Sequence, residues 1–234
     1  MEFVIIFIIV FILMIGFNMA GSLMARRYVD NLNKLQYEDP QACLKKLNQW
    51  PAKLLLPGYN RELVKADIYA RLDDQTNLKI TFDKLTHYAQ KKHSLLSTRD
   101  KAIVYQKQLS YALYKHDATT AHQLNDQLKQ LKQTKNVDDL TNRLIDESNV
   151  CVNIYIDHNY AYIDKGKQAI DDTDNKVVQG IWHYRLAYLY YTKHDQTNVD
   201  KHLSKTVDLL TDSDLYPVIQ QVKANPQMLE TVAI

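Results

Sequence analysis

Residues 3–25 read FVIIFIIVFILMIGFNMAGSLMA and contain no charged side chain. Each residue of an α-helix adds about 1.5 Å, so an uncharged apolar run of this length covers roughly the 30 Å hydrocarbon core of a bilayer. We therefore predict that residues 1–25 form a transmembrane anchor that contacts the lipid bilayer through residues 3–25. The residues that follow are polar and helical in pattern, so one helical domain is expected behind the anchor.

Basic residues follow the apolar run directly, whereas Glu2 is the only charged side chain before it. Loops rich in Lys and Arg stay on the cytoplasmic side of a membrane. Arg26 and Arg27 therefore predict a single-pass protein of the cell membrane with its C-terminal domain in the cytoplasm. The alternative is a cleaved signal peptide, for which Ala20-Gly21-Ser22 offers a small-residue cleavage site.

Small residues recur four positions apart within the run, as Gly16 with Ala20 and as Gly21 with Ala25. Two membrane helices can approach closely along such a stripe. The spacing is compatible with a homodimer through the anchor. The alternative is that Gly and Ala are simply common in membrane helices.

The composition favours a helical domain without a nucleic-acid surface. The 234 residues include only 5 Gly and 5 Pro, both of which are commoner in loop-rich or all-β chains. The formal net charge is +2 with acids and bases interspersed, whereas nucleic-acid binding needs a clustered basic stripe. Cys43 and Cys151 lie far apart, which favours two free thiols over a disulfide.

Similar tripeptides punctuate the polar part of the chain: Leu72-Asp73-Asp74, Lys115-His116-Asp117, Asp157-His158-Asn159 and Lys193-His194-Asp195. Their middle residues are 43, 42 and 36 positions apart. Periods of this size are typical of arrays built from helix–turn–helix units. We therefore predict that each tripeptide is a turn between two helices.

The pattern divides the chain into an anchor (1–25), juxtamembrane helices (26–58), a helical-repeat domain (59–225) and a C-terminal tail (226–234) that frays. Polar residues at Thr98, Asn136 and Thr197 are expected to cap helices. The predicted helices are Pro40–Trp50, Asn60–Leu72, Leu78–Lys91, Arg99–Lys115, Thr120–Gln133, Val137–Asp157, Tyr160–Asp171, Lys176–Lys193, Asn198–Leu210 and Tyr216–Ala224.

Two of these units resemble a tetratricopeptide repeat. Leu186, Ala187 and Tyr190 stand where that family has an apolar, a small and an aromatic residue, and Ala66, Tyr69 and Phe82 form a similar set. The turn glycine of the family is replaced by His or Asp, and Ala112, Ile154 and Lys167 depart from its pattern. The resemblance implies an all-α protein in which the transmembrane helix is followed by an α-solenoid of hairpins with a concave groove. A generic α-solenoid or helical bundle is the alternative.

Tyr184, Tyr188 and Tyr191 lie at i, i+4 and i+7, on one face of the predicted helix Lys176–Lys193. In a tetratricopeptide-like superhelix this face would line the groove beside Ile181. Tyrosine offers a wide apolar surface with a polar tip, which suits the binding of a peptide. We predict that these four residues bind a partner; the alternative is that they pack against a neighbouring helix or the final one.

No motif in the sequence points to catalysis. The eight histidines form no H-E-x-x-H or other ligand spacing, and no phosphate-binding loop is present. We predict no enzyme activity, cofactor or metal. The expected function is that of a bacterial-type membrane-anchored scaffold or adaptor for a protein or peptide partner. The alternatives are an extracytoplasmic protein of envelope assembly or secretion, and a small-ligand receptor or enzyme with a pocket between helices.

Overall fold

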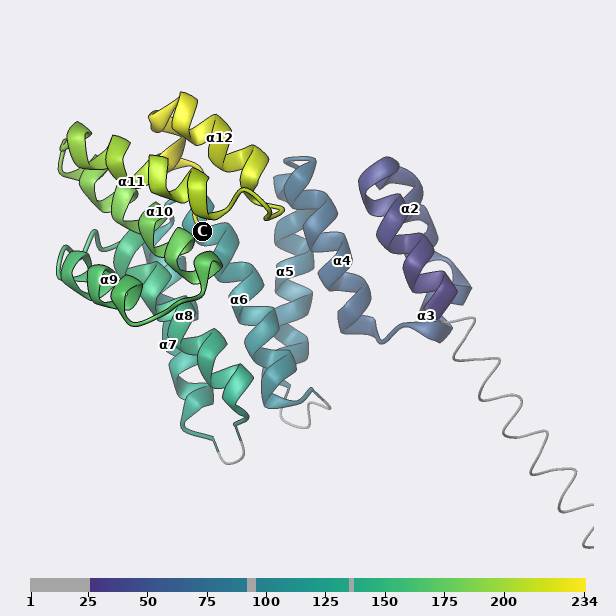
Figure 1. Cartoon of the computed structure of the whole chain (residues 1–234). Coiled ribbons are helices and arrows are strands. Elements are labelled where there is room, and N and C mark those ends of the chain that lie inside the picture. Colours follow the sequence, from purple (N-terminus) through teal and green to yellow (C-terminus); the bar gives the residue numbers. More distant parts are fainter. Residues whose placement is uncertain (1–25, 92–95, 135–136) are drawn as a thin grey trace, which may run out of the picture. The chain divides into compact units, whose positions relative to one another are not determined.

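The structure, a computed structural model, describes residues 26–91, 96–134 and 137–234 (Figure 1). These residues form twelve α-helices and one short 3-10 helix, so the described part of the protein is all-α as predicted. The predicted anchor and its dimer face lie outside the described residues. Within the described ranges, no helix combines the length and the apolar character needed to cross a membrane.

The chain divides into two compact units, unit 1 (Met1–Ser94) and unit 2 (Leu95–Ile234). The division falls inside the range predicted as one repeat domain. Most helices pack against the next one in the chain, consistent with a helical array.

Unit 1 begins, in its described part, with a helix over residues 26–38 and continues with α2 (Pro40–Asn48), α3 (Trp50–Leu55), α4 (Gly58–Arg71) and α5 (Gln75–Gln90). Asp39 caps α2 by accepting a hydrogen bond from the amide of Ala42 at 2.9 Å. The predicted helix Pro40–Trp50 ends early, because Pro51 suits the first turn of a new helix. Trp50 therefore opens α3 instead of closing α2.

The core of unit 1 joins its first helix to α2 and α4. It consists of Leu32, Cys43, Leu44, Leu47 and Ile68, with Tyr28 and Leu56 packed at its edge. The apolar residues of α2 recur at three- and four-residue steps, so one face of α2 is buried.

Unit 2 contains α6 (Thr98–Tyr114), α7 (Ala118–Lys132), α8 (Asp139–Tyr155), α9 (Tyr162–Asp171), α10 (Lys176–Thr192), α11 (Gln196–Leu209), α12 (Tyr216–Ala224) and the 3-10 helix η1 (Pro226–Glu230). Helices α6 and α7 form one hairpin, and α10 and α11 form another. Helix α10 also contacts α8, α9 and η1, which makes it the central helix of the unit (Figure 1). Gly180 permits the close approach of α11, since a Cβ there would lie 2.5 Å from Leu210.

Three of the predicted turns share one backbone geometry. Asp73, His116 and His194 have φ angles of 51°, 52° and 60°, in the left-handed region where glycine is usual. The amides of these residues and of the aspartates that follow return to carbonyl groups of the preceding helix. His and Asp therefore occupy turn positions whose backbone geometry usually favours glycine.

The aspartate after each of these turns ends one helix and begins the next. The amide of Asp117 donates to the carbonyl of Ala112 at 2.9 Å, while its carboxylate accepts from the amide and hydroxyl of Thr120 at 3.1 and 2.6 Å. Asp74 and Asp195 make the corresponding contacts with Asn77 and Asn198. A single aspartate thus provides hydrogen-bond partners both for a carbonyl group at the end of one helix and for an amide at the start of the next.

The fourth turn differs from the other three. His158 has a φ of 46°, but the amide of Asn159 reaches back to the carbonyl of Asn153 and α9 begins without a side-chain cap. Helix α9 packs mainly against α10. The α8–α9 pair is therefore irregular compared with the α4–α5, α6–α7 and α10–α11 pairs.

Two predicted caps are corrected by the structure. Ser97, not Thr98, caps α6 in a reciprocal arrangement with Asp100, and Asp195, not Thr197, caps α11. Asp138 caps α8, while Asn136 lies outside the described residues.

Candidate functional site

The candidate site, which we call the groove, is formed in unit 2 by side chains of α8 and α10, chiefly Tyr155, Tyr184 and Arg185. The residues that follow α12, which we call the tail segment (226–234), occupy this groove. The segment begins as η1, whose Leu229 is buried, and its end lies beside α10 (Figure 1). The segment expected to fray has its main chain hydrogen-bonded to buried side chains in this structure.

Tyr155 of α8 holds the end of the tail segment through both main-chain groups of one residue. Its hydroxyl donates to the carbonyl oxygen of Ile234 at 2.8 Å and accepts from the amide of Ile234 at 3.1 Å. Tyr184 of α10 donates to the carbonyl oxygen of Val232 at 2.7 Å. These bonds involve no side chain of the tail segment, so they can form with any residue type at position 232 and with any except proline at position 234.

Arg185 is a buried cation that links the tail segment to α8. Its Nε donates to the carbonyl oxygen of Ile234 at 2.9 Å, and its Nη2 pairs with the carboxylate of Glu147 and lies 3.6 Å from the sulfur of Cys151. The guanidinium group also lies over the ring of Trp182, 5.2 Å from its centroid. A charge buried to this degree requires such partners.

The start of the tail segment meets the other end of α10 and the turn after α6. The hydroxyl of Tyr191 donates to the carboxylate of Glu230 at 3.2 Å, and the Nε2 atom of His116 contacts the Glu230 carbonyl oxygen. His116 therefore has a second role besides its place in the turn.

The four predicted binding residues lie on α10 at different depths. Tyr184 and Tyr188 are buried, with 0% and 2% exposure, whereas Tyr191 and Ile181 are half-buried. The hydroxyl of Tyr188 donates to the carbonyl oxygen of Tyr155 at 3.2 Å, and the two rings are 4.8 Å apart. Tyr184 and Tyr191 touch the tail segment directly, and Tyr188 supports Tyr155.

Tyr155, Arg185, Glu147 and His116 are site residues that the sequence analysis missed. Arg185 carried a signal, since it is a lone charge within the apolar run from Ile181 to Tyr191. Tyr155 carried none, because one tyrosine at the end of an amphipathic helix is an ordinary core residue.

Burial keeps the tyrosine hydroxyls of the groove in their neutral, hydrogen-donating form. It raises the pKa of Tyr155 and of Tyr184 well above the ordinary value, and it raises the pKa of Tyr188 to about 12. Burial also raises the pKa of the Cys151 thiol. The groove is therefore built to donate hydrogen bonds, not to exchange protons near neutral pH.

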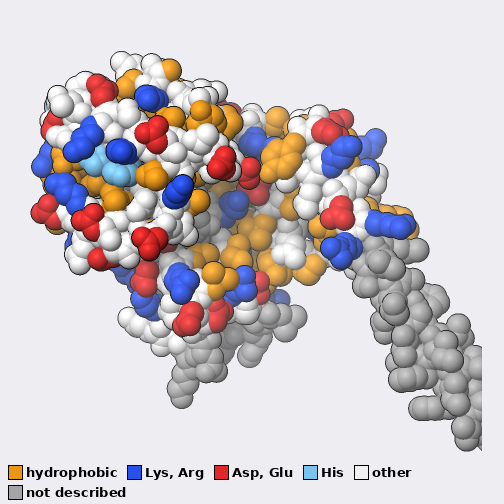
Figure 2. Space-filling view, in the orientation of Figure 1, with side chains coloured by type: hydrophobic (Ala, Val, Ile, Leu, Met, Phe, Trp, Pro, Cys, Tyr) orange, Lys and Arg blue, Asp and Glu red, His pale blue; other side chains and the backbone are white. Residues whose placement is uncertain are grey.

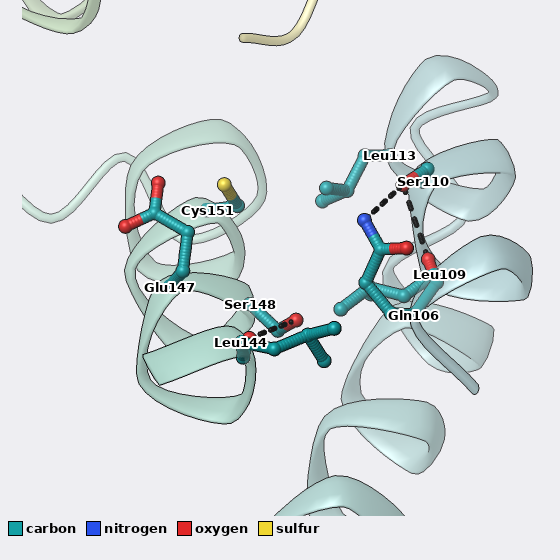
Figure 3. A pocket seen from close by; sticks show the side chains of 8 residues that line it. All are labelled: Gln106, Leu109, Ser110, Leu113, Leu144, Glu147, Ser148 and Cys151. Carbon is teal, nitrogen blue, oxygen red and sulfur yellow. Dashed lines mark hydrogen bonds between the residues drawn. The ribbon is translucent and has the colours of Figure 1, made fainter. Parts of the chain in front are cut away.

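A pocket of about 90 Å³ between α6 and α8 borders the Arg185–Glu147 pair (Figure 3). Figure 3 shows Glu147 and Cys151 on α8 across from Gln106 and Ser110 on α6. The hydroxyls of Ser110 and Ser148 donate to carbonyl groups of their own helices, at 3.1 and 2.8 Å. With its hydroxyls engaged and three leucines in its wall, the pocket suits a small apolar group. Its lining is Gln106, Leu109, Ser110, Leu113, Leu144, Glu147, Ser148 and Cys151.

Across the described ranges, no three His, Cys, Asp or Glu side chains converge in a way that could hold a metal ion. Comparisons with protein-family models, with curated proteins and with solved structures found no match.

Proposed function

We propose that this protein is a membrane-anchored scaffold or adaptor, without catalytic activity, that binds an extended segment of a protein or peptide partner in the groove between α8 and α10. One observation carries the proposal: Tyr155, Tyr184 and Arg185 hold the main-chain atoms of Val232 and Ile234. A groove that donates to main-chain oxygens of one extended segment has the chemistry to hold another of different sequence.

The pocket between α6 and α8 supplies the selective part of this binding. Glu147 and Cys151 line the pocket and also contact Arg185, which holds Ile234. We infer that a partner segment longer than the tail segment places its next residue at this pocket. An apolar side chain there fills a cavity already lined by leucines and excludes water.

The tail segment acts in this proposal as an internal occupant that a partner displaces. A segment attached to its own groove has a high effective concentration, on the order of millimolar. Weak partners are therefore excluded, and the protein responds to partners that fill the pocket as well as the main-chain positions.

The finer features of the architecture belong to the same proposal. The left-handed turns at Asp73, His116 and His194 support hairpins of the tetratricopeptide type. The uncharged run over residues 3–25 and the arginines after it support a single-pass protein with a cytoplasmic groove. Tethering at the membrane raises the concentration of partners on the same surface.

Two variants with opposite expected effects on peptide binding test this function. In the full chain, Leu229→Gln loosens the tail segment and leaves the groove intact, whereas Tyr184→Phe loosens the tail segment by removing a groove donor. Binding of a displayed pool of random peptides is expected to rise in the first variant and to fall in the second. If both variants change peptide binding in the same direction, or neither changes it, the groove does not bind peptides.

A further inference from the structure

Helix α3 exposes two large apolar side chains, those of Trp50 and Leu54. Trp50 and Leu54 are 73% and 74% exposed, the largest exposures among the large apolar residues of the described chain, while Ala52 faces inward with 0%. Trp50 and Leu54 are four positions apart and share one face of the helix, and the exposed Lys53 lies beside them. An aromatic, an aliphatic and a basic side chain therefore point to solvent together.

The chain around α3 is basic. Residues 40–61 contain Lys45, Lys46, Lys53 and Arg61 and no acidic residue. Figure 2 shows basic groups next to apolar ones on the surface of unit 1. A surface of this composition attracts anionic lipid headgroups, at about 1 kcal/mol for each basic residue close to the membrane.

Hydrogen bonds join the end of α2, directly before α3, to the helix over residues 26–38. The hydroxyl of Tyr28 donates to the carbonyl oxygen of Lys46 at 3.1 Å, and the Nζ atom of Lys46 donates to the side chain of Asn31 at 2.8 Å. Lys46 lies in the last turn of α2, just before Trp50 opens α3. Tyr28 follows Arg26 and Arg27, so α3 lies near the residues that succeed the uncharged run.

We propose that α3 docks on the anionic headgroup layer of the membrane that residues 3–25 enter, with Trp50 and Leu54 inserted at the interface. Arg26, Arg27 and Lys53 face lipid phosphates. Trp prefers the membrane interface, where its ring is shielded and its N–H group remains hydrated. Docking fixes unit 1 on the membrane surface instead of leaving it on a free tether. The inference rests on the anchor of the proposed function and is independent of the groove.

The two tryptophans provide the test, since Trp50 is in α3 and Trp182 is in unit 2. The full chain is reconstituted in vesicles of phosphatidylcholine and phosphatidylglycerol whose acyl chains carry bromine, a contact quencher of tryptophan emission. In the Trp182→Phe variant, the emission of Trp50 is expected to fall at least about twofold relative to unbrominated vesicles. In the Trp50→Phe variant, the emission of Trp182 is expected to stay unchanged.

A second pair of variants tests whether α3 itself makes the contact. Added to Trp182→Phe, Leu54→Glu is expected to abolish most of the quenching of Trp50, whereas Leu140→Glu, at a 55% exposed leucine of unit 2, leaves it intact. If the protein binds the vesicles and Trp50 is not quenched, the docking of α3 is overturned and the anchor is not. Protein that does not float with the vesicles overturns both the docking and the anchor.

Discussion

The hydroxyl of Tyr155 is bonded to both main-chain groups of Ile234, accepting from its amide at 3.1 Å and donating to its carbonyl oxygen at 2.8 Å. The two residues are 79 positions apart in the sequence. This relationship converts the inner face of α8 into a site for extended main chain. The same Ile234 oxygen also accepts from Nε of Arg185 at 2.9 Å, so two side chains hold the end of the tail segment.

Replacing Tyr155 by Phe is expected to release the end of the tail segment. The variant loses two hydrogen bonds and leaves the Arg185 contact, so the free energy of unfolding falls by about 1–2 kcal/mol. Hydrogen exchange at the amides of Val232 and Ile234 becomes faster. Tyr114→Phe is the matched control, because Tyr114 is 49% exposed on α6, and it should change neither quantity. Unchanged exchange in Tyr155→Phe would show that the tail is held by other contacts.

The left-handed turn at His194 predicts a stabilising substitution. His194 is exposed and has a φ of 60°, which costs a non-glycine residue about 1–2 kcal/mol. His194→Gly is expected to raise the free energy of urea unfolding by about 0.5–1 kcal/mol, since part of the gain is offset by the flexibility of glycine in the unfolded chain. His194→Val should lower it. A loss of stability in His194→Gly would reveal an interaction of the imidazole that outweighs the strain.

The cap at Asp117 predicts a pH dependence at acid pH. The side chain and amide of Thr120 hold the pKa of Asp117 below the ordinary value of 3.8. The unfolded state therefore binds a proton before the folded state does, and the stabilisation present above pH 3.8 is lost as the pH falls further. Asp117→Ala is expected to cost about 1 kcal/mol at pH 7, with a shrinking difference below pH 3.8. Asp126→Ala, at an exposed position within α7, should cost less than about 0.5 kcal/mol.

The pair formed by His183 and His202 predicts a second, separate pH dependence. Their Nδ1 atoms are 2.8 Å apart, and the ring of His202 stacks on that of Tyr190. Burial, His183 and the charges of Lys201 and Lys167 lower the pKa of His202 to about 4. Burial also lowers the pKa of His183, and the charges of Lys205 and Lys201, which face the same pair, lower it further.

An unfolded histidine titrates near 6.5. Between pH 6.5 and 4, the unfolded state therefore binds a proton at this residue and the folded state does not. The melting temperature is therefore expected to fall through this window as the pH is lowered. His202→Gln should flatten the slope, whereas His87→Gln, at an exposed position of α5, should leave it as it is. Equal slopes in both variants would assign the pH dependence to carboxylates.

The sequence predicted the hairpins because their ends are encoded locally. Asp74, Asp117 and Asp195 each cap a helix three residues before an Asn or Thr, and the His or Asp before them marks the turn. The predicted bounds of α10 and α12 agree with the structure within one residue. Helix α3 was missed because Pro51, expected to break the chain, lies in the first turn of a new helix, and Gln49 alone separates this helix from α2.

The groove was only partly predictable, since its occupant comes from a distant part of the chain. Tyr184 and Tyr191 share a helical face, which the spacing revealed, but the choice of α8 as their opposite wall depends on packing. Tyr155 and Arg185 acquire their roles only when residues 232–234 arrive beside them. Local patterns do not contain such long-range pairing.

The central claim is that the groove binds an extended segment through its main chain. The most direct measurement uses a full chain with a protease site between the exposed Ala224 and Asn225, cut after folding. A labelled peptide with the sequence PQMLETVAI, residues 226–234, is then titrated into the cut protein and its fluorescence anisotropy is followed. Saturable binding is expected, weakened roughly fivefold by Tyr184→Phe, which removes one hydrogen bond, and unaffected by Tyr114→Phe. Loss of the cut segment without any binding of the labelled peptide would contradict the claim.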